Sequence, residues 1–140
     1  MYKLIFISLT LILFSCNSTK NMGNTDVDYR TYLDGEWTLV QLNDRVMDAS
    51  MTRPTITVSQ SGNRVSGNGG CNNFASTLEA IGPNTIEMGD IAATKMACPS
   101  MSVETEYFKT LGDVATYKVE GSTLMLMSKG GKELLSFSRI

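Results

Sequence analysis

The feature that most constrains the fold of this 140-residue chain is a series of short segments in which apolar and polar residues alternate. Residues 54–59, Pro-Thr-Ile-Thr-Val-Ser, show the alternation most clearly, and a period of two is typical of a strand with one buried face. The turn sequence Ser-Gly-Asn at residues 61–63 leads into another such segment at residues 64–68. The two segments are therefore predicted to form a β-hairpin within an antiparallel sheet.

Six further segments are predicted to be strands, because they are short, rich in β-branched or aromatic residues, and separated by turns. The predicted strands cover residues 36–42, 54–59, 64–68, 74–80, 85–89, 114–119, 123–128 and 133–137. Residues 43–53 are polar and predicted to be a loop, and residues 91–99 are assigned to no element. Trp37 lies beside Leu39 in the first strand and is expected in the core.

One segment, residues 101–112, has the spacing of an amphipathic helix. Its apolar residues recur at helical intervals and share one face: Val103, Tyr107, Phe108 and Leu111. Ser100 or Ser102 is a candidate N-cap, and Gly112 is a candidate end. The predicted fold is therefore α+β, with a curved antiparallel β-sheet or partly closed barrel of about eight short strands and one α-helix.

Residues 1–15 are predicted to be a lipoprotein signal peptide. The apolar run at residues 4–14 follows Lys3 and would span only about 16 Å as a helix, short of the roughly 30 Å of a hydrocarbon core. The sequence Leu-Phe-Ser-Cys that ends at Cys16 resembles the lipobox of bacterial lipoproteins, although Phe14 replaces the usual small residue. Cys16 is therefore predicted to become a lipidated N-terminus, which two or more acyl chains would anchor stably. The alternative is an ordinary signal peptide with an incidental cysteine.

Residues 16–32 are predicted to be a lipidated flexible tether, because they are polar and show no apolar periodicity. Asn17 follows the predicted lipidation site in place of the Asp that retains some lipoproteins at an inner membrane. The expected location is therefore the cell envelope, lipid-anchored at the outer membrane and facing the periplasm. A single folded domain is predicted at residues 33–140.

Composition excludes several classes of function. Histidine is absent, which removes Ser-His-Asp and Cys-His catalysis and the commonest zinc and copper ligand. The 12 Lys and Arg residues are outnumbered by 14 Asp and Glu residues, so the chain has no basic field for nucleic acid. We therefore expect no catalytic residue, no metal, no cofactor and no nucleic-acid partner.

Two cysteines remain once Cys16 is assigned to lipid. Cys71 and Cys98 would lie in an oxidising compartment, where a disulfide is the leading interpretation and two buried thiols are the alternative. Met96, Cys98 and Met101 form a group of soft ligands of the kind that selects Cu(I). However, methionine commonly fills gaps in cores, and a disulfide would occupy Cys98, so the metal interpretation is the weaker one.

Two separated motifs carry a family resemblance. The first is Gly-Asn-Gly-Gly-Cys-Asn-Asn-Phe at residues 67–74, and the second is Ile-Ala-Ala-Thr-Lys-Met-Ala-Cys-Pro at residues 91–99. With these motifs the chain resembles the META-domain family, which includes heat-shock-induced HslJ-type bacterial lipoproteins, over about residues 33–140. The residues that carry the resemblance are Gly67, Gly70, Cys71, Asn72, Phe74, Thr94, Met96, Ala97, Cys98 and, after the second motif, Glu104.

The resemblance implies an α+β fold in which a curved antiparallel sheet accompanies a helix. It also implies an envelope protein, since the family members are mostly envelope proteins without an assigned enzymatic activity. Links to stress response and drug tolerance exist at family level, but no catalytic residues carry over to this chain.

The motif residues are interpreted here as structural. The glycines of residues 67–70 lack the Lys-Ser/Thr ending of a phosphate-binding loop and are expected to permit a bulge or a sharp bend. Asn72 is expected to bond its own backbone in that turn. Glu104 is expected to be a favourable charge at the start of the helix.

The leading functional hypothesis is a non-enzymatic envelope lipoprotein that binds another macromolecule or supports the envelope under stress. Its expected partners are a membrane, reached through the lipidated N-terminus, and an envelope protein. The alternative is a carrier with an apolar cavity in the curved sheet that holds a lipid or a small apolar ligand.

Overall fold

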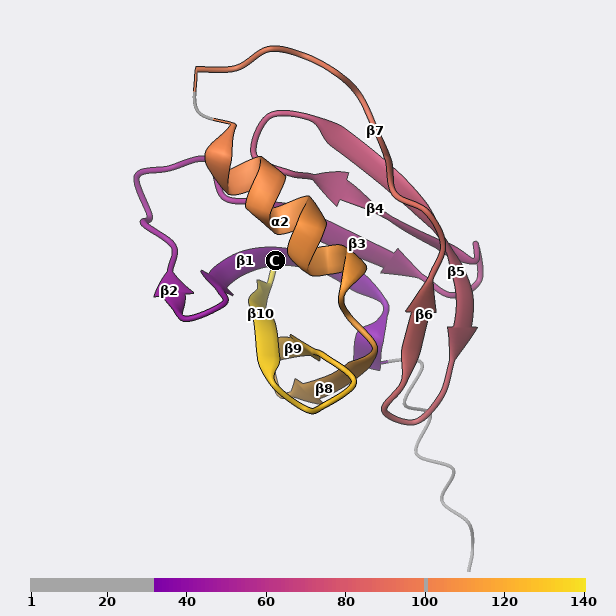
Figure 1. The fold of residues 1–140 in the computed structure, drawn as a ribbon. Helices are drawn as coiled ribbons and strands as arrows, with labels where there is room; N and C mark the ends of the chain where they lie inside the picture. The colour runs from indigo at the N-terminus through magenta and orange to yellow at the C-terminus, as the bar shows by residue number, and fades with distance from the viewer. Residues whose placement is uncertain (1–31, 100) are drawn as a thin grey trace, which may run out of the picture.

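The computed structural model describes residues 32–99 and 101–140, so the predicted signal peptide, Cys16 and nearly all of the predicted tether lie outside the described residues. A ten-stranded sheet curls around a core that one helix covers (Figure 1). The elements are β1 (Gly35–Leu42), β2 (Arg45–Val46), β3 (Thr55–Ser59), β4 (Arg64–Asn68), β5 (Asn73–Ile81), β6 (Ile86–Met88), β7 (Ala92–Ala93), α2 (Ser102–Gly112), β8 (Thr116–Glu120), β9 (Thr123–Met127) and β10 (Glu133–Arg139).

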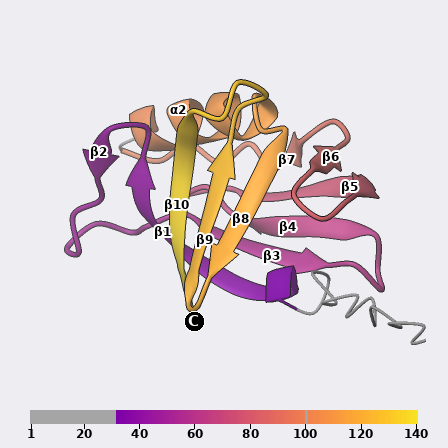
Figure 2. The same cartoon turned by 90° about the horizontal axis from the view of Figure 1, so that it is seen from below.

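The strands pair in the order β6-β5-β4-β3-β1-β10-β9-β8, and each pair is antiparallel. Strand β1 joins the two halves of the sheet, because it pairs with β3 along one edge and with β10 along the other. Figure 2 shows β8, β9 and β10 crossing in front of β3, β4 and β5, with α2 along one side.

The two ends of the sheet meet between β6 and β8. Thr85 forms an isolated antiparallel bridge with Thr116, and the Tyr117 N–H donates to the Asn84 carbonyl oxygen at 2.9 Å. These contacts almost close the sheet into a barrel, and the secondary structure of the domain is mostly β. The predicted barrel of about eight short strands with one helix is thereby confirmed.

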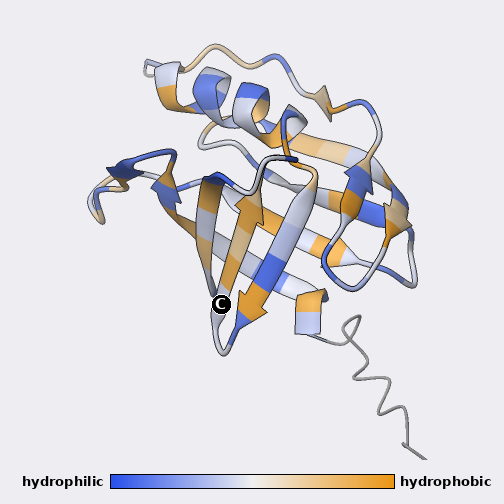
Figure 3. Cartoon of the chain, turned by 60° about the horizontal axis from the view of Figure 1, so that its bottom comes forward, coloured by the Kyte–Doolittle hydropathy of each residue, from blue (hydrophilic) through white to orange (hydrophobic). Residues whose placement is uncertain are grey.

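The core fills the inside of the barrel. Buried side chains alternate with half-buried ones along β3 and β9, and hydrophobic and hydrophilic residues alternate along strands in Figure 3. Ile56 and Val58 face inward from β3, as the period of two predicts. Trp37 is completely buried, which confirms its predicted place. The other fully buried large side chains include Leu39, Tyr107, Phe137, Leu124 and Leu135.

Helix α2 confirms the predicted helix and covers one side of the core. Tyr107 and Leu111 are buried, and the rings of Tyr107 and Phe137 stand 6.4 Å apart, edge to face. The predicted serine cap is wrong for Ser102, which lies inside the helix; the capping position is Met101, and no side chain caps the backbone there. The other candidate cap, Ser100, lies outside the described residues.

Two short strands differ from the sequence prediction. The predicted loop at residues 43–53 contains β2, which follows a tight turn whose Asn43 has a φ of +51°. The unassigned residues 91–99 contain β7, which pairs with the start of β5. Each strand has only two residues and exists because of its partner, so neither produces a periodic pattern.

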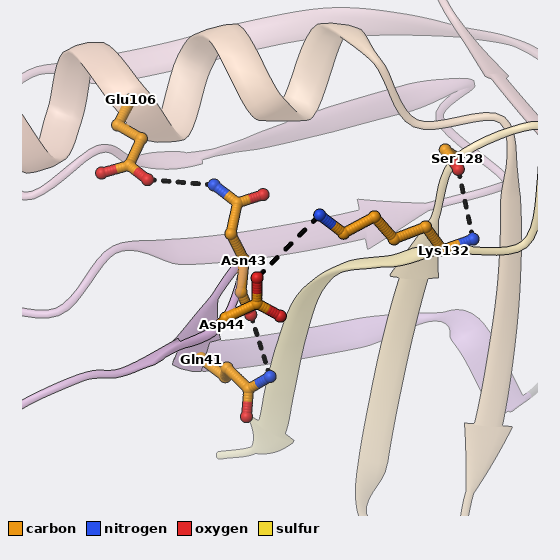
Figure 4. A network of polar contacts seen from close by, with 6 residues as sticks. All are labelled: Gln41, Asn43, Asp44, Glu106, Ser128 and Lys132. Carbon is orange, nitrogen blue, oxygen red and sulfur yellow. Dashed lines mark hydrogen bonds and ion pairs between the residues drawn. The ribbon is translucent and has the colours of Figure 1, made fainter.

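A group of polar contacts ties the β1–β2 turn to α2 and to the loop before β10 (Figure 4). The Asn43 amide donates to Glu106 at 2.9 Å, and Arg45 forms a 2.7 Å ion pair with the same carboxylate. Lys132 lies 3.9 Å from Asp44. The side chains of the two ion pairs are between 39% and 91% exposed, so each pair adds at most about 1 kcal/mol to stability.

The start of the domain is fastened to the last strand. The Arg139 guanidinium stacks over the Trp37 ring at 4.1 Å and donates to the carbonyl oxygens of Tyr32 and Asp34. The Trp37 indole N–H donates to the Leu33 carbonyl at 3.0 Å. Within the described part of the chain, no helix is long and apolar enough to span a bilayer.

Candidate functional site

The first motif begins where β4 passes very close to β3. A Cβ atom on Gly67 would stand 2.1 Å from the Thr55 carbonyl oxygen, so no larger residue fits without displacing a strand. The expected bulge is absent at this pair, because Gly67 stands in regular register opposite Ile56. The expected bend lies at Gly70, whose φ of +110° is a conformation that favours glycine.

Asn72 is buried, and its side chain uses its full hydrogen-bonding capacity. Its Oδ1 accepts bonds from the Thr94 hydroxyl at 2.8 Å and from the Met96 N–H at 2.7 Å. Its Nδ2 donates to the Met96 carbonyl at 3.2 Å and to Glu104 Oε1 at 2.6 Å. The expectation that Asn72 bonds its own backbone is therefore wrong, because these partners lie 22 to 32 residues further along the chain.

Glu104 is the acceptor at the centre of this network. It stands in the first turn of α2, as predicted, but only 4% of its surface is exposed. Its Oε2 accepts the Asn72 N–H at 2.5 Å and the Cys71 N–H at 3.1 Å. Burial alone would raise the pKa of Glu104, but the hydrogen bonds from Asn72 and Cys71 together lower it below its ordinary value near 4.5. Glu104 is therefore ionised at neutral pH and holds the first motif against the helix. This role goes beyond the favourable charge at the helix start that the sequence predicted.

The two motifs are also joined covalently. Cys71 and Cys98 form a disulfide with their Cα atoms 6.3 Å apart, as the sequence predicted. The disulfide occupies the Cys98 sulfur, so Cys98 has no thiolate to complete a set of soft ligands with Met96 and Met101. Across the described residues, no group of three or more His, Cys, Asp or Glu side chains is placed to hold a metal ion.

Phe74 completes the connection between the first motif and the helix. Its ring meets Tyr107 at 5.9 Å and Phe108 at 5.4 Å between centroids, both edge to face. The structure thus brings the predicted motif residues into one region, where the turn after β4, the segment after β7 and the start of α2 meet.

A surface groove of about 620 Å³ runs beside this network. One wall is formed by residues 91–97 and the other by α2 and Met101. The lining is mainly apolar and includes Ile91, Ala93, Met96, Ala97, Met101 and Phe108, with Lys95 as its one cationic residue. The groove was not predicted from the sequence, although the run of small and apolar residues around Lys95 is a signal of it.

Two smaller hollows lie nearby. One of about 260 Å³ lies beside the disulfide and is lined by Met51, Cys98 and Val103 among others. The other, of about 400 Å³, lies at the far end of α2 and combines Glu79 and Asp90 with apolar residues. The groove of about 620 Å³ is larger than both and lies directly against both motifs.

The hydrogen bonds of the network hold the two motifs and α2 together. The Glu104 carboxylate accepts three hydrogen bonds, and the Asn72 amide has no capacity left. A general acid needs a raised pKa, whereas the pKa of Glu104 is lowered. The groove and the exposed segment that forms its wall are the parts of this region that another molecule can reach.

Comparison with known families gives one match: the model of the META domain matches residues 30–139. No curated protein matches the chain.

Solved structures show the same fold at low sequence identity. A protein from Burkholderia xenovorans, solved by NMR, has 22% identity and a TM-score of 0.64, over 81% of this chain and 87% of that one. A duf4847 family protein from Bacteroides vulgatus, solved by crystallography, has 18% identity and a TM-score of 0.55, over 79% of this chain and 96% of that one. At these identities the likeness concerns the fold alone.

Proposed function

The chain belongs to the META domain family, and from that premise we propose that it is a non-enzymatic binding module, held at the cell envelope by lipid on Cys16. The proposal further places it at the outer membrane, where it supports the envelope under stress by binding another macromolecule. The groove of about 620 Å³ is its binding surface.

The observation that carries the proposal is a contrast within the motif region. The polar motif residues Asn72 and Glu104 are buried and hydrogen-bonded, and Cys71 is bridged to Cys98. The adjoining apolar side chain of Met96 is 53% exposed. Exposed apolar surface beside a rigid framework is typical of an interaction site. The framework therefore supports a binding surface.

No observation favours the alternative function, a carrier of a lipid or a small apolar ligand. It requires an apolar cavity inside the curved sheet, but that space holds the fully buried side chains of Trp37, Tyr107 and Phe137. The proposal therefore places binding outside the barrel.

The proposed lipid anchor at Cys16 can be tested directly by labelling. Cells that express the chain with labelled palmitate are expected to yield labelled protein in the membrane fraction, and globomycin should cause the uncleaved precursor to accumulate. Cys16→Ala should abolish the label, while Cys71→Ser with Cys98→Ser should retain it, because a thioether forms on the first cysteine alone. A leader still cleaved under globomycin, with soluble unlabelled protein, would refute the anchor.

The binding surface is tested separately by photo-crosslinking in intact envelopes. A photoreactive phenylalanine analogue at Met96 is expected to give discrete adducts, while the same analogue at Val46 is not. Val46 is a matched control, because it is 75% exposed but does not line the groove. Adducts that are equal at both positions, or absent at Met96, would contradict a binding surface at the groove.

A further inference from the structure

Strand β7 and the residues after it form an edge of the sheet. The Thr94 N–H donates to the Asn73 carbonyl at 3.0 Å, and the Met96 N–H donates to Asn72 Oδ1 at 2.7 Å. Both bonds point back towards β5 and the turn before it. The Thr94 and Met96 N–H groups of this segment are therefore both bonded on the side of β5.

The opposite side of the segment presents main-chain groups to the outside. Successive residues of an extended chain direct their N–H and C=O groups to alternate sides, so those of Ala93 and Lys95 point away from β5. Among the residues that the structure describes, none forms a hydrogen bond with these groups, and β7 pairs with β5 alone. Ala93 and Lys95 thus offer an unpaired strand edge.

This edge lies along the groove of about 620 Å³. Ala93 and Lys95 line one wall, and Met101, Thr105 and Phe108 line the wall opposite. The small side chains of Ala93 and Ala97 allow another chain to approach closely. An occupant of this groove would therefore meet free backbone donors and acceptors on one side and apolar side chains on the other.

We propose that the groove takes an extended peptide segment of a partner protein, which pairs with the main chain at Ala93 and Lys95 as an added strand. This inference rests on the proposed binding function and specifies its partner. Main-chain pairing supplies the affinity, and the groove accepts apolar side chains at alternate positions of the peptide. Lys95 is the one cation of the lining, and the Glu104 carboxylate there is already bonded to Asn72 and Cys71, so an acidic residue in the peptide complements Lys95.

The unpaired edge favours a peptide over a lipid tail. An acyl chain would fill the apolar part of the groove but would remove the Ala93 and Lys95 groups from water without bonding them, which is unfavourable. The edge is also short and carries a lysine, features that oppose uncontrolled pairing between copies of a sheet. Both features suit a specific, limited contact.

The test uses the full chain as isolated from cells and the blocked peptide acetyl-Glu-Val-Ser-Leu-Thr-Val-Glu-amide. Without peptide, hydrogen exchange read by NMR should be slow for the amides of Thr94 and Met96 and fast for those of Ala93 and Lys95. At saturating peptide, exchange at Ala93 and Lys95 should slow by about tenfold or more, corresponding to about 1.4 kcal/mol. No protection at these two amides with millimolar peptide would overturn the proposal.

Two N-methylated isomers of the peptide test the main-chain pairing itself. Each carries N-methyl groups on one alternate set of residues, so each removes the donors on one side of the peptide strand. One isomer should bind as the parent does, and the other should bind about tenfold more weakly or worse. Equal binding by the two isomers, whether strong or absent, would overturn strand addition.

A variant tests the same edge from the protein side. Ala93→Pro removes an N–H that points away from β5 and should weaken the parent peptide about tenfold. If this variant unfolds, the N-methylated isomers still decide the question. The control is Val46→Pro, an exposed substitution in β2 that is remote from the groove and should leave peptide binding unchanged.

The same measurements separate the possible failures. If phospholipid micelles shift the Met96 and Met101 resonances while Ala93 and Lys95 stay unprotected with peptide, the groove holds an acyl chain and the peptide proposal is wrong. If adducts form at Met96 in envelopes but the peptide does not bind, the binding function stands and this inference fails. Peptide binding without lipid on Cys16 would instead refute only the anchor.

Discussion

Replacing Glu104 with alanine is expected to lower the free energy of unfolding by about 3–5 kcal/mol. The variant would leave three donors without their acceptor: the buried N–H and side-chain amide of Asn72 and the partly buried N–H of Cys71. Each unsatisfied donor costs about 1–3 kcal/mol, and relaxation recovers part of the sum. Urea denaturation followed by circular dichroism, with the slope compared between variants, measures the change.

Glu106→Ala is the matched control for this experiment. Glu106 lies two residues further along α2 and also accepts hydrogen bonds, from Asn43 and Arg45, but its side chain is 39% exposed. Its removal should change the unfolding free energy by about 1 kcal/mol or less. Equal losses in the two variants would show that the burial of Glu104 has no special importance.

A swap of charge across the network gives a sharper version of the test. Glu104→Gln places an amide NH₂ group against the NH₂ group of Asn72, so two donors face each other. Asn72→Asp places a carboxylate against that of Glu104, so two negative acceptors face each other. Each single change is therefore unfavourable. With both changes together, the new amide at position 104 can donate to the new carboxylate at position 72, although the Met96 carbonyl then loses its donor. The double variant is therefore expected to be more stable than the sum of the single losses predicts.

The pKa of Glu104 also sets a pH dependence. Its folded pKa lies below the ordinary value near 4.5, so the unfolded chain binds more protons between those two values. The contribution of Glu104 to stability is thus complete above about pH 4.5 and is lost as pH falls through the folded pKa. Denaturation midpoints of the native chain should fall across this acid window more steeply than those of Glu104→Gln, whose side chain does not titrate.

Removing the disulfide is expected to cost about 3–4 kcal/mol in the chain-entropy account. Cys71 and Cys98 are 27 residues apart in the sequence, and their bond restricts the unfolded chain over that whole loop. Cys71→Ser with Cys98→Ser should therefore shift the urea midpoint downwards without changing the slope greatly. Reduction of the native chain should shift it in the same direction.

Thiol counting provides the control for the disulfide. The denatured native chain should show two additional thiols only after reductant, and the doubly substituted chain should show none. Two reactive thiols before reduction, or an unchanged midpoint in the double variant, would contradict a stabilising bridge. Combining the bridge variant with Glu104→Ala should give a loss that differs from the sum, because both connections hold the same motif.

The sequence predicted the strands and the helix well because each depends on local periodicity. The alternation of β3 and the four-residue spacing of Tyr107 and Leu111 are properties of neighbouring residues, and they persist whatever the rest of the chain does. The pairing of β1 with β3 and with β10 could not be predicted from the sequence, because no short turn connects these strands. Strands β2 and β7 were missed because two residues cannot express a period.

The candidate site was predicted in its membership but not in its arrangement. The motifs identified Asn72 and Glu104, and the even cysteine count identified the Cys71–Cys98 pair. However, Asn72 was expected to bond locally, because asparagine often does so in turns, whereas its partners are brought to it by the barrel. The groove escaped prediction because it is formed by residues 91–97 facing a helix that begins later in the chain.

The Arg139 contact at the start of the domain has a mechanical consequence for a chain that is pulled from its N-terminus. Force applied at Tyr32 would pass into β1, which has hydrogen-bonded neighbours along both edges, and into Arg139 on β10. Tension at the start of the domain is therefore shared from the outset between two strands, β1 and β10. A domain fastened in this way meets tension from its N-terminal side at β1, the strand that pairs with neighbours along both edges.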